Sequence, residues 1–300
     1  MREIRWTVTK EDQGKTAEQV FRLRMGITRS MLSRLKFHQG LFLDGEQVHT
    51  DARVRLGQVL TAVFRDEKPA WQGLVPSDVR FGIAYEDQDI LVVDKPAPLP
   101  SIASAAQRGD TLEGAVYRYF KMPEHFVYRP VNRLDKGTSG LMVIAKNAFS
   151  QAAMQKELHR DFTRTYLAVT EGVPKEKEGS IAQPIRKAEA SGVRRICAPD
   201  GKAARTDYKV IKTGGGRALL ELLLHTGRTH QIRVHLAFIG CPITGDYLYG
   251  TEHPALNGRF ALHSHTVAFR HPMTGEMMRF TSPLPKELSR LLKTEDGQRT

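Results

Sequence analysis

The stretch Arg129–Lys146, RPVNRLDKGTSGLMVIAK, carries the strongest structural signal in the chain. Within it a lone carboxylate, Asp135, follows Arg133 and comes just before the turn-forming residues Lys136–Gly140. The apolar run Leu141–Ala145 then predicts a buried strand. An acid in a rigid turn at the start of a core strand is well placed to be a preorganised reacting group. Taken alone, these residues favour a simpler interpretation, in which Asp135 caps its own turn and pairs with Arg133 at the surface.

The residues on either side of this stretch predict an α+β fold. The predicted strands are Phe81–Tyr85, Ile90–Val93, Leu141–Ala145, Arg164–Thr170 and Ala218–Leu224, and the predicted helices are Thr111–Phe120 and Asn147–Leu158. Helices and strands alternate irregularly, without βαβ repeats, so we expect a mixed, largely antiparallel sheet flanked by helices. Neither a GxxxxGKS/T loop nor a GxGxxG fingerprint occurs, and Gly214–Gly216 therefore indicates a turn rather than a nucleotide site.

A short amphipathic helix is predicted after Thr229. Its apolar residues, Ile232, Leu236 and Ile239, recur at helical spacing. Thr229 is positioned to cap the start of the helix, and the Gly-Cys-Pro sequence after Ile239 ends it. Arg233 then lies in the first turn, on a face different from the apolar one.

The histidines and cysteines do not have the spacing of a metal site. His225, His230 and His235 are five residues apart, and on a helix this spacing turns side chains about 140° from one another. The HExxH motif is absent. Cys197 and Cys241 are too few for a disulfide framework and lack the paired spacing of a zinc ribbon. We therefore expect no metal and reduced cysteines.

A small unit is predicted before the large one. The sequence TAEQVFRLRMGITRSMLSRLKFHQGLFLDGEQV predicts two short helices, a stop at Gly40 and a hairpin turning at Asp44-Gly45, and a strand at Val54–Phe64 follows. Prolines and glycines then interrupt every periodicity, which predicts a linker. We expect an N-terminal domain at residues 1–68, a linker at 69–79, a large domain at 80–290 and a fraying charged tail at 291–300.

Charge and hydropathy narrow the class of protein. The 300 residues contain 45 Lys and Arg against 33 Asp and Glu, a formal charge of +12. This excess favours a polyanionic partner, because binding releases the partner's condensed counterions. A basic enzyme with solvated lysines accounts for the charge equally well. No signal peptide or membrane-spanning run is apparent, so we expect a cytoplasmic protein without membrane association.

Taken together, several segments resemble the RluA-type pseudouridine synthases. The string RLDKGTSGL, followed by an apolar strand and Ala-Lys, is similar to their catalytic signature, whose indispensable Asp corresponds to Asp135. Further segments match in the family's order; they are Tyr85–Pro100, Arg164–Gly172, Gly201–Val210, Thr226–Gly250 and Leu262–Glu276. Two departures are visible, since Asn132 stands where the family commonly has His and Pro98 where it has Gly.

The N-terminal unit resembles a small RNA-binding domain shared with a small-subunit ribosomal protein and tyrosyl-tRNA synthetases, here called the S-four-like domain. Basic residues crowd its predicted helices, and the resemblance implies RNA contacts by Arg29, Arg34 and Lys36. Gln58 departs from the pattern, because the family usually has Asp after Gly. A small α/β module with solvated arginines is the alternative.

The resemblance to pseudouridine synthases also implies roles in the large domain. Asp135 is the reacting carboxylate, Arg233 pairs with it and keeps it ionised in a nearly dry pocket, and Tyr166 stacks on the extruded uracil. The residues implied to contact RNA are Arg133, Asn132, Lys95, Arg228, His230 and Gln231.

The implied reaction breaks the bond from uracil N1 to ribose C1′, turns the base and joins C5 to C1′. Nothing is oxidised or hydrolysed, so no cofactor is expected. Structured RNA is the implied partner, ribosomal RNA in preference to transfer RNA, and we expect a monomer. Two alternatives stay open. One is a non-catalytic RNA-binding or ribosome-assembly factor, and the other is a hydrolase, which would usually need a second carboxylate.

Overall fold

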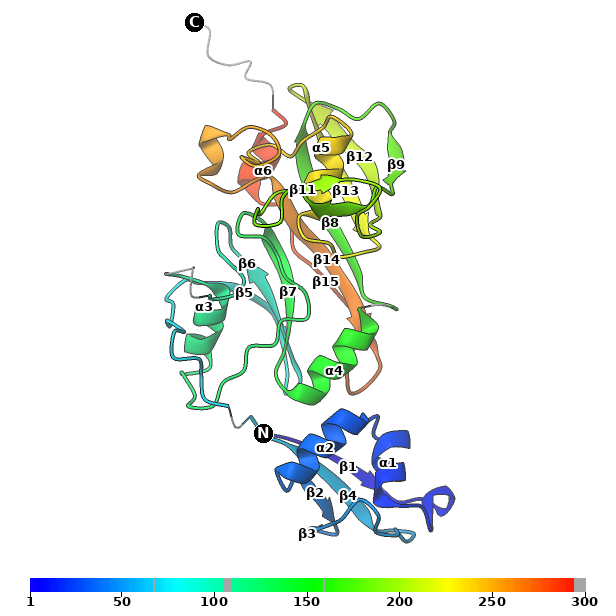
Figure 1. Ribbon diagram of the computed structural model, residues 1–300. Coiled ribbons are helices and arrows are strands. Elements are labelled where there is room, and N and C mark those ends of the chain that lie inside the picture. The colour runs from blue at the N-terminus through cyan, green and yellow to red at the C-terminus, as the bar shows by residue number, and fades with distance from the viewer. Residues whose placement is uncertain (67, 105–108, 159, 294–300) are drawn as a thin grey trace, which may run out of the picture.

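The computed structural model describes residues 1–66, 68–104, 109–158 and 160–293. The molecule is elongated, with a small N-terminal lobe at one end and a large body built around one long sheet (Figure 1). Of the predicted tail, residues 294–300 lie outside the described part. Within the described residues, no helix has both the length and the apolar content to cross a lipid bilayer.

The N-terminal lobe packs two helices on one face of a four-stranded sheet of order β1-β4-β2-β3. Its elements are β1 (Arg2–Thr7), a 3₁₀ turn (Lys10–Asp12), α1 (Ala17–Leu23), α2 (Arg29–Phe37), β2 (Leu41–Leu43), β3 (Glu46–Gln47) and β4 (Val59–Phe64). Thr16 and Thr28 cap the two helices through their side chains. Asp44 and Gly45 both have positive φ, as the predicted type I′ hairpin turn requires. The two helices and the hairpin are therefore present as predicted.

Two details of this lobe differ from the prediction. The last strand begins at Val59 rather than Val54, because the chain first turns at Gly57, whose φ is +85°. Strand β1 was not predicted. It pairs antiparallel with β4, from Arg2 opposite Phe64 to Thr7 opposite Val59.

The body contains a nine-stranded mixed sheet of order β5-β6-β7-β14-β8-β13-β12-β9, with β15 also paired to β14. The strands are β5 (Gly82–Glu86), β6 (Ile90–Lys95), β7 (Ser139–Ala145), β8 (Thr163–Glu171), β9 (Glu178–Ile181), β12 (Thr206–Gly214), β13 (Arg217–Leu224), β14 (Leu262–Arg270) and β15 (Met277–Thr281). All pairs are antiparallel except β7 with β14. The predicted mixed, largely antiparallel sheet is thus confirmed.

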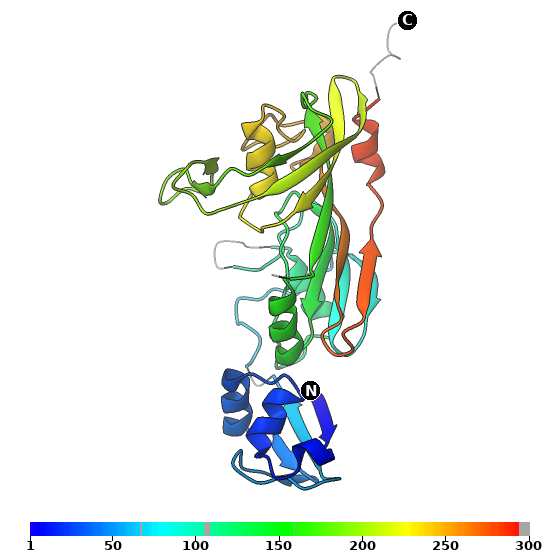
Figure 2. The same cartoon turned by 90° about the vertical axis from the view of Figure 1, so that its right-hand side faces the viewer.

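Helices and a short arm complete the body. The helices are α3 (Leu112–Tyr119), α4 (Ala148–Glu157), α5 (Gln231–Phe238), a 3₁₀ turn (Pro254–Leu256) and α6 (Lys286–Arg290). Strands β10 (Ile185–Lys187) and β11 (Arg195–Cys197) form a separate two-stranded arm that projects from the body on the same side as α5 (Figure 2). The helices of the N-terminal lobe lie on this side too.

Strand β7 is the structural centre of the segment that contains Asp135. All seven of its residues are buried. Gly140 has a φ of +106°, and a Cβ there would lie 2.3 Å from the carbonyl oxygen of Ser264 in β14. Only glycine can occupy this position, because β7 and β14 run parallel and approach closely at this point. The turn before Gly140 is therefore fixed against two core strands.

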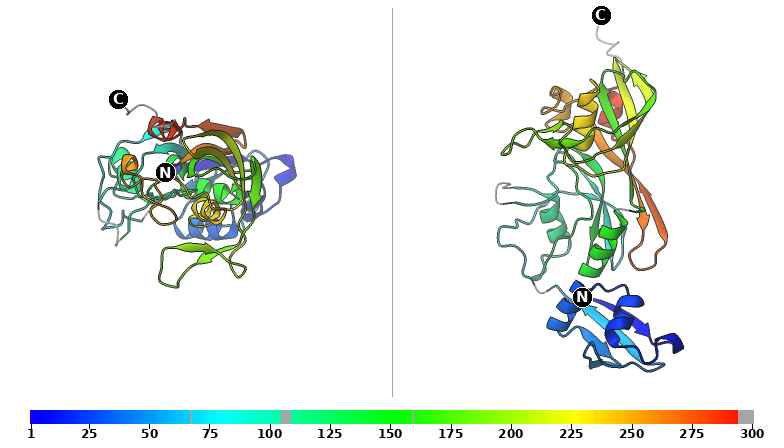
Figure 3. Two further views of the ribbon diagram at one scale, coloured as in Figure 1. Left: turned by 90° about the horizontal axis from the view of Figure 1, so that it is seen from above. Right: turned by 45° about the vertical axis from the view of Figure 1, so that its right-hand side comes forward.

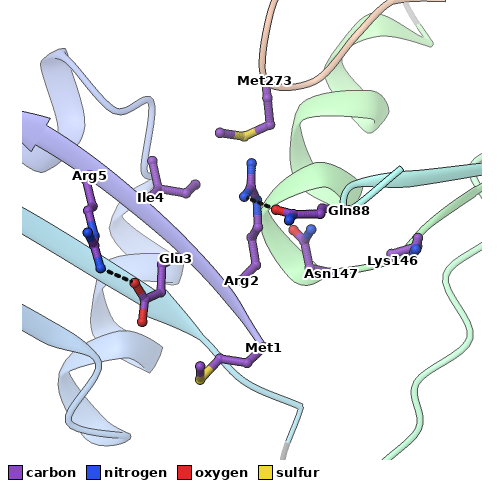
Figure 4. A pocket seen from close by; sticks show the side chains of 9 residues that line it. All are labelled: Met1, Arg2, Glu3, Ile4, Arg5, Gln88, Lys146, Asn147 and Met273. Atoms are coloured by element: carbon purple, nitrogen blue, oxygen red, sulfur yellow. Dashed lines mark hydrogen bonds and ion pairs between the residues drawn. The ribbon is translucent and has the colours of Figure 1, made fainter. Parts of the chain in front are cut away.

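The two lobes meet at α4 and the β5–β6 turn. Phe149 of α4 packs against Phe64, with ring centroids 5.6 Å apart, inside the core of the N-terminal lobe. Arg2 forms an ion pair with Asp89 at 2.9 Å. A pocket of about 800 Å³ opens at this junction, lined by residues 1–5 on one side and by Gln88, Lys146, Asn147 and Met273 on the other, as Figure 4 shows. In the oblique view on the right of Figure 3, the lobe continues the long axis of the body.

Candidate active site

The loop around Asp135 is held on both sides by the segment Lys95–Ser101. The Ser101 hydroxyl donates to the carbonyl of Leu134 at 2.6 Å, and Leu134 N–H donates to that hydroxyl at 3.2 Å. The N–H of Leu99 donates to the carbonyl of Lys136 at 2.8 Å. The residues immediately before and after Asp135 are therefore both bonded to the same segment, which leaves its carboxylate little freedom to shift.

Arg233 links Asp135 to a second acid. Its Nη1 donates to Asp135 Oδ2 at 3.1 Å, while Nε and Nη2 donate to the two oxygens of Asp246 at 2.7 and 2.8 Å. The guanidinium lies over the rings of Phe260 and Tyr249, at 4.2 and 5.0 Å from their centroids. Burial acts to lower the pKa of Arg233, but the hydrogen bonds to Asp246 and Asp135 outweigh it and raise the pKa above its usual value. The predicted pairing of Arg233 with Asp135 is present.

The carboxylate of Asp135 is half-buried rather than enclosed. Its side chain is 30% exposed, against 3% for Arg233 and none for Asp246. Both groups close to it, Arg233 and His230, face Oδ2. Within the described part of the chain, Oδ1 has no hydrogen-bond partner. The site is thus more open than the nearly dry pocket we expected, and a bound substrate must cover it.

Helix α5 begins differently from the prediction. Its N-cap is His230, in the left-handed region with φ of 59° and no side-chain capping bond, so Thr229 does not cap the helix. This backbone turns the imidazole back toward the site. His230 Nδ1 lies 2.9 Å from the Tyr249 hydroxyl and Nε2 lies 3.9 Å from Asp135 Oδ2. Burial lowers the pKa of His230, although Asp135 acts in the opposite direction.

Helix α5 is also more buried than an amphipathic surface helix. Its residues from Gln231 to Leu236 are all buried. The side chain of Gln231 makes four hydrogen bonds: its Oε1 accepts from the Thr226 hydroxyl and the N–H of Arg228, and its Nε2 donates to the carbonyl of Arg205 and the hydroxyl of Thr206. The polar face of the helix therefore points into the protein and carries Arg233 with it.

Tyr166 belongs to the core next to the site. It lies on β8, opposite Leu222 of β13 and Ser264 of β14, and is 5% exposed. Burial raises the pKa of its phenol, so the hydroxyl is neutral. Its ring is largely covered in this conformation, and its stacking on a uracil stays a prediction.

The remaining residues expected to contact RNA fall into two groups. Arg133 and Arg228 are exposed near the site, and Arg29, Arg34 and Lys36 are exposed on α2. Lys95, Asn132 and Gln231 are 0%, 5% and 3% exposed, which does not fit the direct contacts expected of them. Lys95 donates to the carbonyls of Pro96 and Leu99, and Asn132 Oδ1 accepts from the N–H of Val143. Their polar atoms support the loops around Asp135 from inside.

Sequence reasoning missed Asp246, Tyr249 and Ser101. Asp246 is the only acid between Thr226 and Gly250, which is the one sequence signal that could have identified it. Tyr249 and Ser101 offer no such signal, because their roles depend on contacts with distant backbone.

One cluster outside the site has the residue types of a metal site. Ligand atoms of Asp87, Asp89 and His271 lie within 4.8 Å of one another. They already have protein partners, since Asp89 accepts bonds from Arg2 and Asn147, and Asp87 accepts from His271. Hydrogen bonds within the protein account for this cluster.

Comparison with known proteins agrees with the geometry. A model of the RNA pseudouridylate synthase family matches residues 89–238. An uncharacterized RNA pseudouridine synthase of Bacillus subtilis, YjbO, is 35% identical over 275 residues, which cover 91% of this chain and 96% of that protein. The ribosomal large subunit pseudouridine synthase D of Xanthomonas campestris is 36% identical, covering 91% of this chain and 86% of that protein.

A solved structure has the same fold. The human RNA pseudouridylate synthase domain containing 4 superposes with a TM-score of 0.56 at 25% identity, covering 70% of this chain and 92% of that one. The arrangement around Asp135 is consistent with these similarities, which show that the chain belongs to the RNA pseudouridylate synthase family.

Proposed function

We propose that this protein isomerises uridines of large-subunit ribosomal RNA to pseudouridine, with Asp135 as the reacting carboxylate. The observation that carries the proposal is the Arg233–Asp135 pair, in which one carboxylate oxygen is held at 3.1 Å and the other is free within the described residues. The ribosomal substrate rests on relatives named as large-subunit enzymes. The formal charge of +12 suits any RNA.

The residues of the site suit the steps of the reaction. The target uridine must first leave its stack, at a free-energy cost of a few kcal/mol. Arg133 and Arg228, both exposed, are placed to hold the distorted backbone through phosphate contacts. Asp135 Oδ1 then either attacks C1′ and displaces the uracil at N1, or takes a proton from C2′ as the C1′–N1 bond breaks and the uracil leaves. Both routes need an ionised carboxylate. Arg233, whose Nη1 donates to Asp135 Oδ2 at 3.1 Å, supplies the opposite charge beside the carboxylate.

The N-terminal lobe extends the RNA-binding surface in this proposal. Exposed Arg29, Arg34 and Lys36 lie on α2, and the helices of the lobe face the same side of the molecule as α5 and the arm (Figure 2). An RNA bound at Asp135 can therefore continue across this lobe, which we propose acts as an S-four-like domain. We further propose that the enzyme works as a monomer in the cytoplasm.

The test measures tritium released from C5-labelled uridine in large-subunit ribosomal RNA transcripts. We expect release with the wild-type protein and none with Asp135→Asn, while RNA binding by filter retention stays within about twofold. Asp78→Asn is the matched control, because its side chain is 83% exposed and far in sequence from the loop. Release by Asp135→Asn at the wild-type rate would refute the role of Asp135. Modification of transfer RNA transcripts alone would refute the ribosomal substrate.

A further inference from the structure

His230 is hydrogen-bonded through one ring nitrogen and faces Asp135 with the other. Nδ1 lies 2.9 Å from the hydroxyl of Tyr249, and the two rings meet edge to face with centroids 5.7 Å apart. Nε2 faces Asp135 Oδ2 at 3.9 Å. The imidazole therefore connects the carboxylate of the active site to a phenol that the sequence patterns did not identify.

The partners of Tyr249 favour one position for the imidazole proton of His230. The backbone N–H of Arg195 in β11 donates to the Tyr249 hydroxyl oxygen at 2.8 Å, which makes that oxygen an acceptor. The hydroxyl hydrogen is then free to donate to His230 Nδ1. A neutral imidazole that accepts at Nδ1 carries its proton at Nε2, facing Asp135.

The charges around His230 are consistent with a neutral ring. Burial and the guanidinium groups of Arg233 and Arg195 lower the pKa of His230, whereas Asp135 and Asp246 raise it. The result lies below the usual value. Tyr249 is also neutral, because burial raises the pKa of its phenol.

We propose that Tyr249 and His230 are positioning residues for Asp135. Tyr249 fixes His230 in the form that carries its proton on Nε2. The Nε2–H group and Arg233 together hold Oδ2 of Asp135, which leaves Oδ1 to react with the ribose. This inference rests on the proposed function. Both donors approach the same oxygen, and Oδ1 has no partner among the described residues. The distance of 3.9 Å exceeds a hydrogen bond, but such contacts commonly tighten when substrate binds.

The neutrality of His230 has a chemical consequence. An imidazolium beside Asp135 would add a second positive charge next to Arg233 and make the carboxylate a weaker base and nucleophile. A neutral N–H donor orients the same oxygen without that effect. Removing such a donor lowers turnover more than RNA binding, because in this proposal His230 acts on Asp135 and the RNA contact that the resemblance implies for it is secondary.

A direct test reads the tautomer of His230 by multiple-bond ¹⁵N–¹H correlation spectra of protein labelled at histidine. The signal is assigned by its loss in His230→Gln. We expect a protonated Nε2 and an unprotonated Nδ1 in the wild type, and a mixture of tautomers in Tyr249→Phe. A wild-type signal with the proton at Nδ1 would overturn the inference, as would an unchanged pattern in Tyr249→Phe. Once His230→Gln has assigned the signal, the wild-type spectrum decides the point even if Tyr249→Phe fails to fold.

Single-turnover kinetics supply the second test. Tyr249→Phe and His230→Gln should each lower the rate of pseudouridine formation about 10- to 100-fold, as loss of orienting contacts does elsewhere, with RNA affinity unchanged. Tyr247→Phe is the matched control, because Tyr247 is 56% exposed two residues away. A wild-type rate in Tyr249→Phe would sink the inference. Absence of pseudouridine with the wild-type enzyme would instead refute the proposed function and leave the tautomer result standing.

Discussion

Lys95 should make the stability of the protein depend on pH in an unusual direction. Its side chain is completely buried, and its Nζ donates to the carbonyls of Pro96 and Leu99 at 3.0 and 2.7 Å. Burial lowers its pKa from 10.5 to about 7; Asp135 counteracts this shift, and Arg259 adds to it. No carboxylate hydrogen-bonds to the ammonium group in the described residues, so the ion is poorly compensated.

The sign and size of this pH dependence of stability follow from proton linkage. Unfolded Lys95 keeps its proton up to its ordinary pKa of 10.5, whereas folded Lys95 releases it near pH 7. The unfolded state therefore binds more protons between these values, and the free energy of unfolding rises with pH across that window. The whole shift corresponds to about 5 kcal/mol. Between pH 7 and pH 9 this one group should add about 2 kcal/mol.

Lys95→Met isolates this contribution, because methionine has a similar length and does not titrate. Urea unfolding followed by circular dichroism at pH 7 and pH 9 should show a larger gain in stability for the wild type than for Lys95→Met, by about 2 kcal/mol. Circular dichroism is preferred to fluorescence, since both tryptophans, Trp6 and Trp71, precede the body. Lys212→Met, at an exposed position of β12, should behave like the wild type. Equal pH dependence in the wild type and Lys95→Met would refute a depressed pKa.

Two further perturbations test the packing around the site and between the lobes. Asp246→Asn keeps the shape of the side chain but removes the charge to which Arg233 donates at 2.7 and 2.8 Å. Urea unfolding should show that the free energy of unfolding falls by about 3 kcal/mol. A fall of less than about 1 kcal/mol would contradict a tightly coupled buried pair. The exposed pair of Asp161 with Arg270 supplies the control, and Asp161→Asn should change stability by less than about 1 kcal/mol. Phe149→Ala removes the ring that packs on Phe64 at 5.6 Å, and limited proteolysis should then cut faster between the lobes. An unchanged cleavage rate would show that the other contacts between the lobes, such as the Arg2–Asp89 ion pair, hold them without this ring.

Local patterns predicted the parts of this protein whose cause is local. The helices α3 and α4 begin at Thr111 and Asn147, whose side chains accept hydrogen bonds from Gly114 and Ser150, and both caps are visible in the sequence. The glycines between β12 and β13 form the expected turn, with positive φ at Gly215 and Gly216. Strand β1 was missed, because it is short and contains three charged residues among its six.

Burial of polar side chains could not be predicted in this way. Lys95, Asn132 and Gln231 are of types usually found at the surface, and the resemblance placed them on RNA. Each is buried because the fold brings a distant or backbone partner to it, such as the N–H of Val143 for Asn132 and the hydroxyl of Thr206 for Gln231. Asp246 was missed for the same reason, since its importance depends on Arg233 lying 13 residues before it and packing over it.

The site combines a rigid carboxylate with an open face, and this combination has a consequence for selectivity. The loop of Asp135 is fixed by Ser101, Leu99 and Arg233, yet the side chain of Asp135 remains 30% exposed, so in the free enzyme the carboxylate that we propose to react is accessible to water. A solvated carboxylate is a weak nucleophile and base compared with one from which water has been removed. In the proposed reaction, an RNA that places an extruded uridine over Asp135 removes that water. Rigidity alone therefore does not activate the site, and correct docking of the RNA becomes part of the chemistry.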